Sequence, residues 1–98
     1  MKIVIKKVGE AGKVVEVENT LETFQNIVGG YIEIYPLRIT GLVIVCNEEG
    51  LLQGLKPNCI LGQDVIVGDI AIVRQGEEDF EGLNEAEIRA LRRFGLVE

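Results

Sequence analysis

The fold of this chain depends most on residues 41–58, whose sequence is GLVIVCNEEGLLQGLKPN. Residues 42–45 are continuously apolar, which predicts a strand in the interior of a sheet. The residues that follow form a polar loop punctuated by Gly50 and Gly54. Loops held by a rigid scaffold commonly carry binding groups, although the same residues also fit an ordinary turn closed by Pro57. The stretch therefore predicts a central strand that leads into a candidate binding loop.

Period-two alternation predicts further strands on both sides of this stretch. Residues 2–8 and 13–18 alternate and are separated by a short glycine turn, so they predict an antiparallel hairpin. Residues 30–36 alternate again and end in proline, which ends a strand or places it at a sheet edge. Residues 64–74 predict a strand pair, or one long strand interrupted by Gly68.

Two short helices are predicted near residues 20–28 and 85–94, where apolar residues recur at helical spacing. Asn19 and Asn84 are each followed three residues later by a glutamate, which is the pattern of a capping box. Gly29 is placed to end the first helix in a left-handed conformation.

These elements predict a single domain over residues 1–98. Its expected class is α+β, with a small antiparallel or mixed β-sheet and two short α-helices. The expected core consists of apolar residues on the inward faces of these elements: Ile3, Ile5, Val15, Val17, Leu21, Phe24, Ile32, Ile34, Leu42, Ile44, Ile70, Ile72, Ile88 and Leu91.

Composition weighs against an enzyme. The chain contains no histidine and no serine, so Ser-His and Cys-His nucleophile systems are excluded. The standard phosphate-loop glycine fingerprints are absent. The two cysteines, Cys46 and Cys59, lack the spacing of a zinc site, so neither a metal nor a cofactor is expected. Cys46 is expected to pack as a small buried hydrophobe.

Charge and hydropathy limit the partners and the cellular location that are expected. The formal net charge of −6 argues against binding to nucleic-acid backbones, which relies on clustered lysine and arginine. No apolar run approaches the roughly 20 residues that span a bilayer. No secretory signal precedes the first strand, so a cytoplasmic protein with reduced thiols is expected.

A set of polar and aromatic residues is the candidate binding surface. The tyrosines of the strand at residues 30–36 share one face and can frame a planar ligand, although sheets favour tyrosine in any case. The loop amides offer hydrogen bonds, and a phosphate would be bound by Arg38, Lys56 or Arg74. The asparagines can instead bond their own backbone, as in turns. The candidate ligand-binding residues are Tyr31, Tyr35, Arg38, Asn47, Gln53, Lys56 and Asn58.

The segments NEEG at residues 47–50 and GLKPN at residues 54–58, followed by a DVIVGD strand and a capped helix, resemble a known family. It is the small, phage-associated domain of unknown function 3846, and the resemblance covers nearly the whole chain. The resemblance supplies no catalytic residue. It implies an accessory protein in the host cytoplasm, if phage-encoded, that counters host defence by binding a host protein or a nucleotide signal.

Three hypotheses follow. The first is a non-catalytic protein that sequesters a small nucleotide-derived signal molecule. The second is a protein-binding inhibitor of a host defence or nucleic-acid enzyme, acting through the acidic loop at residues 77–81. The third is a structural subunit joined through sheet edges and the tyrosine face. The small core and the tyrosine face also predict a homo-oligomer, at least a dimer.

Overall fold

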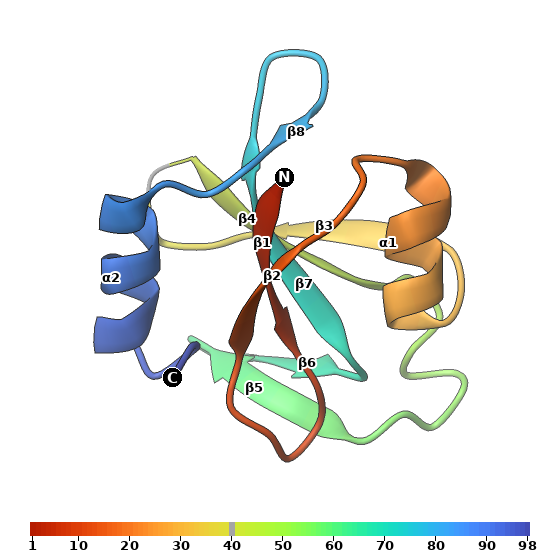
Figure 1. Ribbon diagram of the computed structural model, residues 1–98. Coiled ribbons are helices and arrows are strands. Elements are labelled where there is room, and N and C mark those ends of the chain that lie inside the picture. The colour runs from red at the N-terminus through yellow and green to blue at the C-terminus, as the bar shows by residue number, and fades with distance from the viewer. Residues whose placement is uncertain (40) are drawn as a thin grey trace.

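The computed structural model describes residues 1–39 and 41–98. These residues form an antiparallel six-stranded sheet, a separate two-stranded hairpin and two helices (Figure 1). The elements in chain order are β1 (Lys2–Lys6), β2 (Lys13–Glu16), α1 (Leu21–Val28), β3 (Ile32–Pro36), β4 (Leu42–Asn47), β5 (Pro57–Leu61), β6 (Asp64–Val67), β7 (Ile70–Gln75), β8 (Phe80–Glu81) and α2 (Glu85–Arg93). The α+β prediction is confirmed.

The large sheet has the strand order β2-β1-β7-β4-β3, and β8 pairs with β7 beyond the end of β1. The predicted hairpin of β1 and β2 is confirmed, with Ile3 opposite Val15. The apolar strand β4 is interior as predicted, but β7 takes the middle position. Gly68 lies in the left-handed region at φ 79° and separates β6 from β7, so residues 64–74 form two strands rather than one.

The sheet is covered on both faces. Figure 1 shows α1 on one side of it and α2 on the other, with the β5–β6 hairpin below. Side chains of β4 and β7 therefore alternate between two apolar clusters. On the α1 side the buried residues are Ile3, Phe24, Val28, Val43, Val45, Ala71 and Val73. On the α2 side they are Val4, Leu42, Ile44, Cys46, Ile66, Ile70, Ile72, Leu83, Ile88, Leu91, Leu96 and Val97.

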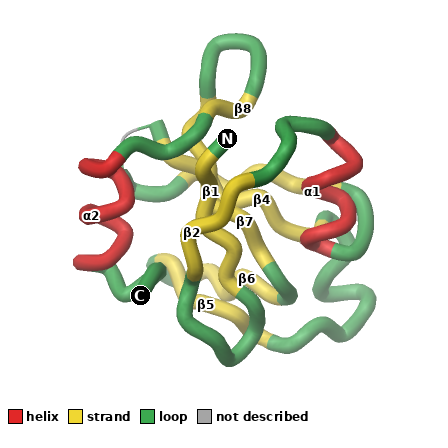
Figure 2. The backbone as a smooth tube through the Cα atoms, in the orientation of Figure 1, coloured by secondary structure: helices red, strands yellow, loops and turns green. Residues whose placement is uncertain are grey.

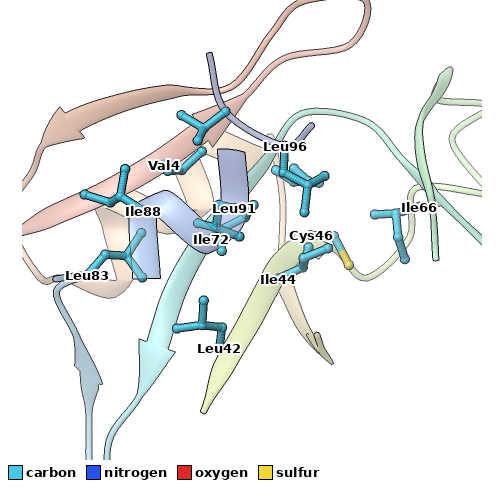
Figure 3. Packing of buried hydrophobic residues seen from close by; sticks show 12 residues of the cluster. Val4, Leu42, Ile44, Cys46, Ile66, Ile72, Leu83, Ile88, Leu91 and Leu96 are labelled. Carbon is cyan, nitrogen blue, oxygen red and sulfur yellow. The ribbon is translucent and has the colours of Figure 1, made fainter. Parts of the chain in front are cut away.

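The α2 side holds the larger cluster. Ile88 and Leu91 lie on one face of α2 and pack toward the sheet, where Ile44 and Ile72 are fully buried (Figure 3). A helix needs such a one-sided apolar stripe to bury itself on a sheet. After α2 the chain turns at Gly95, and Leu96 joins the same cluster.

The expected core needs correction at its margins. Leu21 and Ile34 were expected inside, but 59% and 45% of their surfaces are exposed. Leu21 is the first residue of α1, and Ile34 lies on β3, an edge strand whose outer side has no neighbour among the described residues. Four further expected core residues are only partly buried: Ile5, Val15, Val17 and Ile32.

The helix ends were predicted well for α2 and less well for α1. Asn84 caps α2, and its reciprocal bonds with Glu87 complete the expected capping box. The N-cap of α1 is Thr20, whose hydroxyl accepts from the Thr23 N–H, so the prediction of Asn19 was wrong by one residue. Asn19 instead donates to the Phe80 carbonyl across the chain. The side chain of Asn19 therefore bonds a distant backbone group, and the neighbouring threonine caps the helix.

The connection between β4 and β5, residues 48–56, crosses from the large sheet to the separate hairpin (Figure 2). Its turns are closed by backbone bonds, including Gln53 N–H to Glu49 O at 2.9 Å. A Cβ at Gly50 would lie 2.7 Å from Val67, so glycine permits the close approach expected there. Gly54 has φ 69°, the left-handed conformation that glycine adopts most readily.

Within the described residues, neither helix has the length and apolar content needed to cross a membrane.

Candidate functional site

A cavity of about 590 Å³ opens where three segments meet. They are the end of β3 with the residues after it, the turn between β5 and β6, and the C-terminal end of α2. Sites for small ligands commonly have volumes of about 300–1,000 Å³ and combine apolar walls with a few polar groups. We call this the Arg38 cavity. Its lining includes Tyr35, Arg38, Ile60, Gly62, Asp64 and Phe94.

Two large apolar side chains form its exposed walls. Phe94 is 67% exposed and Ile60 is 71% exposed. Gly95, at φ 74°, ends the helix and turns the chain so that Leu96 enters the core while Phe94 remains outside. An exposed aromatic ring and an exposed isoleucine in one lining provide apolar surface on which a planar group can pack.

Arg38 supplies the positive charge of the cavity. Among the described residues it makes no ion pair, whereas Arg74 is held by Glu81 at 3.0 Å and by Glu87 at 2.9 Å. A Cβ built on Gly62 would lie 3.5 Å from Nη2 of Arg38, so the guanidinium lies directly over that glycine. A guanidinium has five N–H donors in a planar fork, which suits carboxylate and phosphate groups.

Tyr35 and Asp64, both in the lining of the cavity, are joined by a hydrogen bond. The Tyr35 hydroxyl donates a hydrogen bond to the Asp64 carboxylate. This bond raises the pKa of the Tyr35 hydroxyl, with burial and the negative charge of Asp64 adding to it, while Arg38 lowers it. The hydroxyl is therefore neutral at physiological pH. The bond ties β3 to the β5–β6 turn, so it fixes one wall of the cavity.

Tyr31 and Gln53 lie at a different place. Both line a separate cavity of about 450 Å³ with Glu49 and Gln25, next to the end of α1. Residues four apart on a strand are separated by about 13 Å, since each residue advances the chain by about 3.3 Å. The structure therefore does not place Tyr31 and Tyr35 in one cavity.

Asn47 is 5% exposed and its side chain is fully engaged. Its Nδ2 donates to Val28 O at 3.1 Å and to Gln53 Oε1 at 3.2 Å. Its Oδ1 accepts from the Glu49 N–H at 2.8 Å. Asn47 thus joins β4, the end of α1 and the loop, and no hydrogen-bonding group of it points into the Arg38 cavity.

Asn58 has a comparable set of contacts elsewhere. Its Nδ2 donates to the carbonyls of Lys6 and Gly68, both at 2.8 Å, and its Oδ1 accepts from Lys6 Nζ at 2.8 Å. Lys56 is exposed nearby, and its carbonyl accepts from the Gly68 N–H. The seven candidate residues therefore fall into three groups, of which only Tyr35 and Arg38 line the Arg38 cavity.

Sequence reasoning missed the walls of this cavity. Phe94 continues the helical spacing of Ile88 and Leu91, and that spacing by itself predicts a core position. The signal that separates them is Gly95 directly after it, since a left-handed glycine ends the helix and changes the direction of the chain. Ile60 alternates with Leu61 on a short hairpin, and no pattern in the sequence shows which side is exposed.

The two thiols have the chemistry of buried groups. Burial raises the pKa of Cys46 to about 11, with smaller contributions from Glu33 and Cys59. Burial also raises the pKa of Cys59, against the lowering effect of Lys6. Thiolates are the reactive form of cysteine, so neither thiol is activated as a nucleophile. No cluster of three or more potential metal ligands occurs among residues 1–39 and 41–98.

The fold and the cavity define a small α+β protein with a candidate ligand-binding site. The family described as "Domain of unknown function (DUF3846)" matches residues 1–95, so the chain belongs to that family. Neither the curated proteins nor the solved structures gave a match.

Proposed function

We propose that this protein is a non-catalytic binder of a small anionic ligand with a planar apolar part, such as a nucleotide-derived signal molecule. The observation that carries the proposal is the arrangement in the Arg38 cavity. A guanidinium without an ion pair among the described residues lines the same cavity as two exposed apolar side chains, Phe94 and Ile60.

Each part of such a ligand has a counterpart in the cavity. A phosphate would accept hydrogen bonds from Arg38, and charge-assisted bonds of this kind are about twice as strong as neutral ones. A base would pack on Phe94 and Ile60. The Gln63 amide and the Asp64 carboxylate lie in the same lining and would meet polar edges of the base.

The proposed biological role is sequestration by a phage-type accessory protein. A binder that removes a defence signal needs affinity but no reacting group, which agrees with a chain that lacks histidine and serine. The family resemblance supports this role only through the kind of genome in which such domains occur. Inhibition of a host protein is the alternative, and it predicts a retained protein instead of a retained nucleotide.

The test is to purify the protein from cells with active nucleotide-based defence signalling, release bound material by heat, and identify it by mass spectrometry. The chain has no tryptophan and two tyrosines, so a retained base would strongly raise absorbance at the nucleotide maximum. Titration calorimetry with nucleoside monophosphates, diphosphates and cyclic dinucleotides then measures affinity. Absence of both a retained nucleotide and any binding in this panel contradicts the proposal.

Two substitutions locate the site. Arg38→Ala should weaken binding at least tenfold, about 1.4 kcal/mol, because a hydrogen bond to a charged group contributes about 1.5–3 kcal/mol. Phe94→Ala should also weaken binding. Both side chains are exposed, so each change should alter the free energy of unfolding by less than about 0.5 kcal/mol.

The matched control is Arg89→Ala, which removes the same charge from an exposed position of α2 outside the cavity lining. Affinity should stay within twofold of the unsubstituted protein. Equal losses in Arg38→Ala and Arg89→Ala would show a general charge effect, and the Arg38 cavity would no longer be the site.

A further inference from the structure

The outer edge of β3 has no partner strand among the described residues. On its inner side, Tyr31 O accepts from the Glu48 N–H and the Leu37 N–H donates to Leu42 O. Backbone groups alternate in direction along an antiparallel strand. The N–H and C=O groups of Ile32 and Ile34 therefore point outward, to the free edge.

Exposed apolar side chains lie on both sides of this edge. On the α1 side, Leu21 and Ile34 line a cavity of about 300 Å³. On the other side, Leu51, Leu52 and Val65 are exposed around a cavity of about 430 Å³ that lies between β3 and β6. A strand added to β3 would therefore have one of these apolar cavities, here called grooves, beside it on each face of the sheet. Its side chains alternate between the two faces.

Both grooves are negatively charged. Glu33, Glu48 and Asp64 line the groove between β3 and β6, and Glu78 and Asp79 line the groove on the α1 side. Among the described residues, neither lining contains a lysine or an arginine. The Arg38 cavity differs in this respect, because a guanidinium belongs to its lining.

We propose that the β3 edge binds an extended, basic segment of another protein by strand addition. In this recognition mode the main-chain hydrogen bonds provide affinity, while alternate side chains enter pockets and provide specificity. Here the outward groups of Ile32 and Ile34 supply the main-chain bonds. The apolar grooves accept aliphatic side chains, and the five carboxylates along their rims select lysine and arginine.

The same charges disfavour a second copy of this chain at this edge. Each copy has a formal net charge of −6, and an antiparallel pair centred on Ile34 would place two acidic grooves against each other. Pro36 adds a further restriction, because it has no N–H to donate to a neighbouring strand. Charge and proline on edge strands are common protections against self-pairing. A basic segment, by contrast, is attracted by the negative charge of this edge.

The probe is a short blocked peptide that repeats two valines and two lysines, so each face of the added strand carries both residue types. The control peptide has glutamate in place of every lysine. Calorimetry should show binding of the basic peptide only, with affinity that falls as salt is added. Hydrogen exchange of the Ile32 and Ile34 amides should slow at least tenfold on binding. Amides of β2, the opposite edge of the sheet, should exchange at unchanged rates.

Substitutions test whether the carboxylates that line the grooves bind the basic peptide. The double change Glu33→Lys with Glu48→Lys should weaken binding of the basic peptide at least tenfold, since it turns two attractions into repulsions. Both residues are exposed, so the fold is preserved. Glu10→Lys makes the same kind of charge change at an exposed turn between β1 and β2 and should leave affinity within twofold.

Three outcomes overturn the proposal: no binding of the basic peptide, equal weakening by Glu10→Lys and the double change, or binding without protection of the Ile32 and Ile34 amides. Protection of these amides in the protein alone, together with a dimer in sedimentation, assigns the edge to a second copy and overturns it as well. Arg38→Ala should leave peptide binding unchanged. This variant therefore distinguishes peptide binding at the β3 edge from ligand binding in the Arg38 cavity, and either proposal can fail without the other.

Discussion

Replacing Asn47 with alanine should destabilise the protein strongly. The side chain is nearly inaccessible and joins three segments through hydrogen bonds to Val28, Glu49 and Gln53. Val28 is the last residue of α1, and its carbonyl belongs to the helix end, where no intrahelical donor is available. The amide of Asn47 supplies the missing donor.

The magnitude follows from which partners water can reach after the substitution. The carbonyl of buried Val28 is left without a donor, which costs about 1–3 kcal/mol. The backbone N–H of exposed Glu49 can bond water, so its loss adds about 0.5–1 kcal/mol. The exposed Gln53 side chain adds little. We expect a total loss of about 1.5–4 kcal/mol, which is a large part of the roughly 5–15 kcal/mol that stabilises a typical protein.

Urea unfolding followed by circular dichroism measures this loss. Asn47→Asp should also lose stability, because it keeps an acceptor for Glu49 but faces the Val28 carbonyl with a second acceptor. Gln53→Glu is the matched control at the other end of the network, because it keeps an acceptor for Asn47 Nδ2. It should change the free energy of unfolding by less than about 0.5 kcal/mol. An Asn47→Ala loss below about 1 kcal/mol, together with weaker ligand binding, would refute the structural role and restore Asn47 as a binding residue.

Three further predictions concern stability and assembly. Asn58→Ala should cost about 1–3 kcal/mol in urea unfolding, because two backbone carbonyls lose their donor; a loss below about 0.5 kcal/mol would show that the contact is dispensable. The pKa of the Cys46 thiol is raised from 9.0 to about 11 in the folded protein. The stability that the protonated Cys46 thiol contributes is therefore fully present below pH 9 and is lost as pH rises toward about 11. A Cys46→Ala variant whose stability declines equally over this range would contradict the assignment of the decline to Cys46. Sedimentation at micromolar concentration should show a species heavier than the 10.8 kDa monomer, with the Ile34 amide still exchanging freely; a clean monomer would remove the prediction of self-association.

Local patterns in the sequence correctly predicted the elements whose cause is itself local. Asn84 and Glu87 form their capping box within one helical turn. Gly29 ends α1 at φ 79°, as expected of a residue without a Cβ. The β1–β2 hairpin follows from two alternating segments joined by a short turn. Each of these features depends on residues within a few positions of one another.

Predictions that required the strand order were less accurate. Ile32 and Ile34 have the same alternating pattern as Ile70 and Ile72, yet the latter pair is fully buried and Ile34 is largely exposed. The difference is that β7 lies in the middle of the sheet while β3 lies at its edge. Alternation identifies a strand, but it carries no information about how many neighbours the strand has.

The candidate site divides in the same way. The sequence by itself identified Arg38 and Tyr35 as residues with binding chemistry, and it identified Asn47 and Asn58 for the same reason. Only the tertiary structure showed that the side-chain amides of both asparagines donate hydrogen bonds to distant backbone carbonyls. It also showed that Arg38 has no ion pair among the described residues. A side chain's chemistry is fixed by its type. Its availability depends on partners that folding brings from elsewhere in the chain, as Val28 is brought to Asn47 and Lys6 to Asn58.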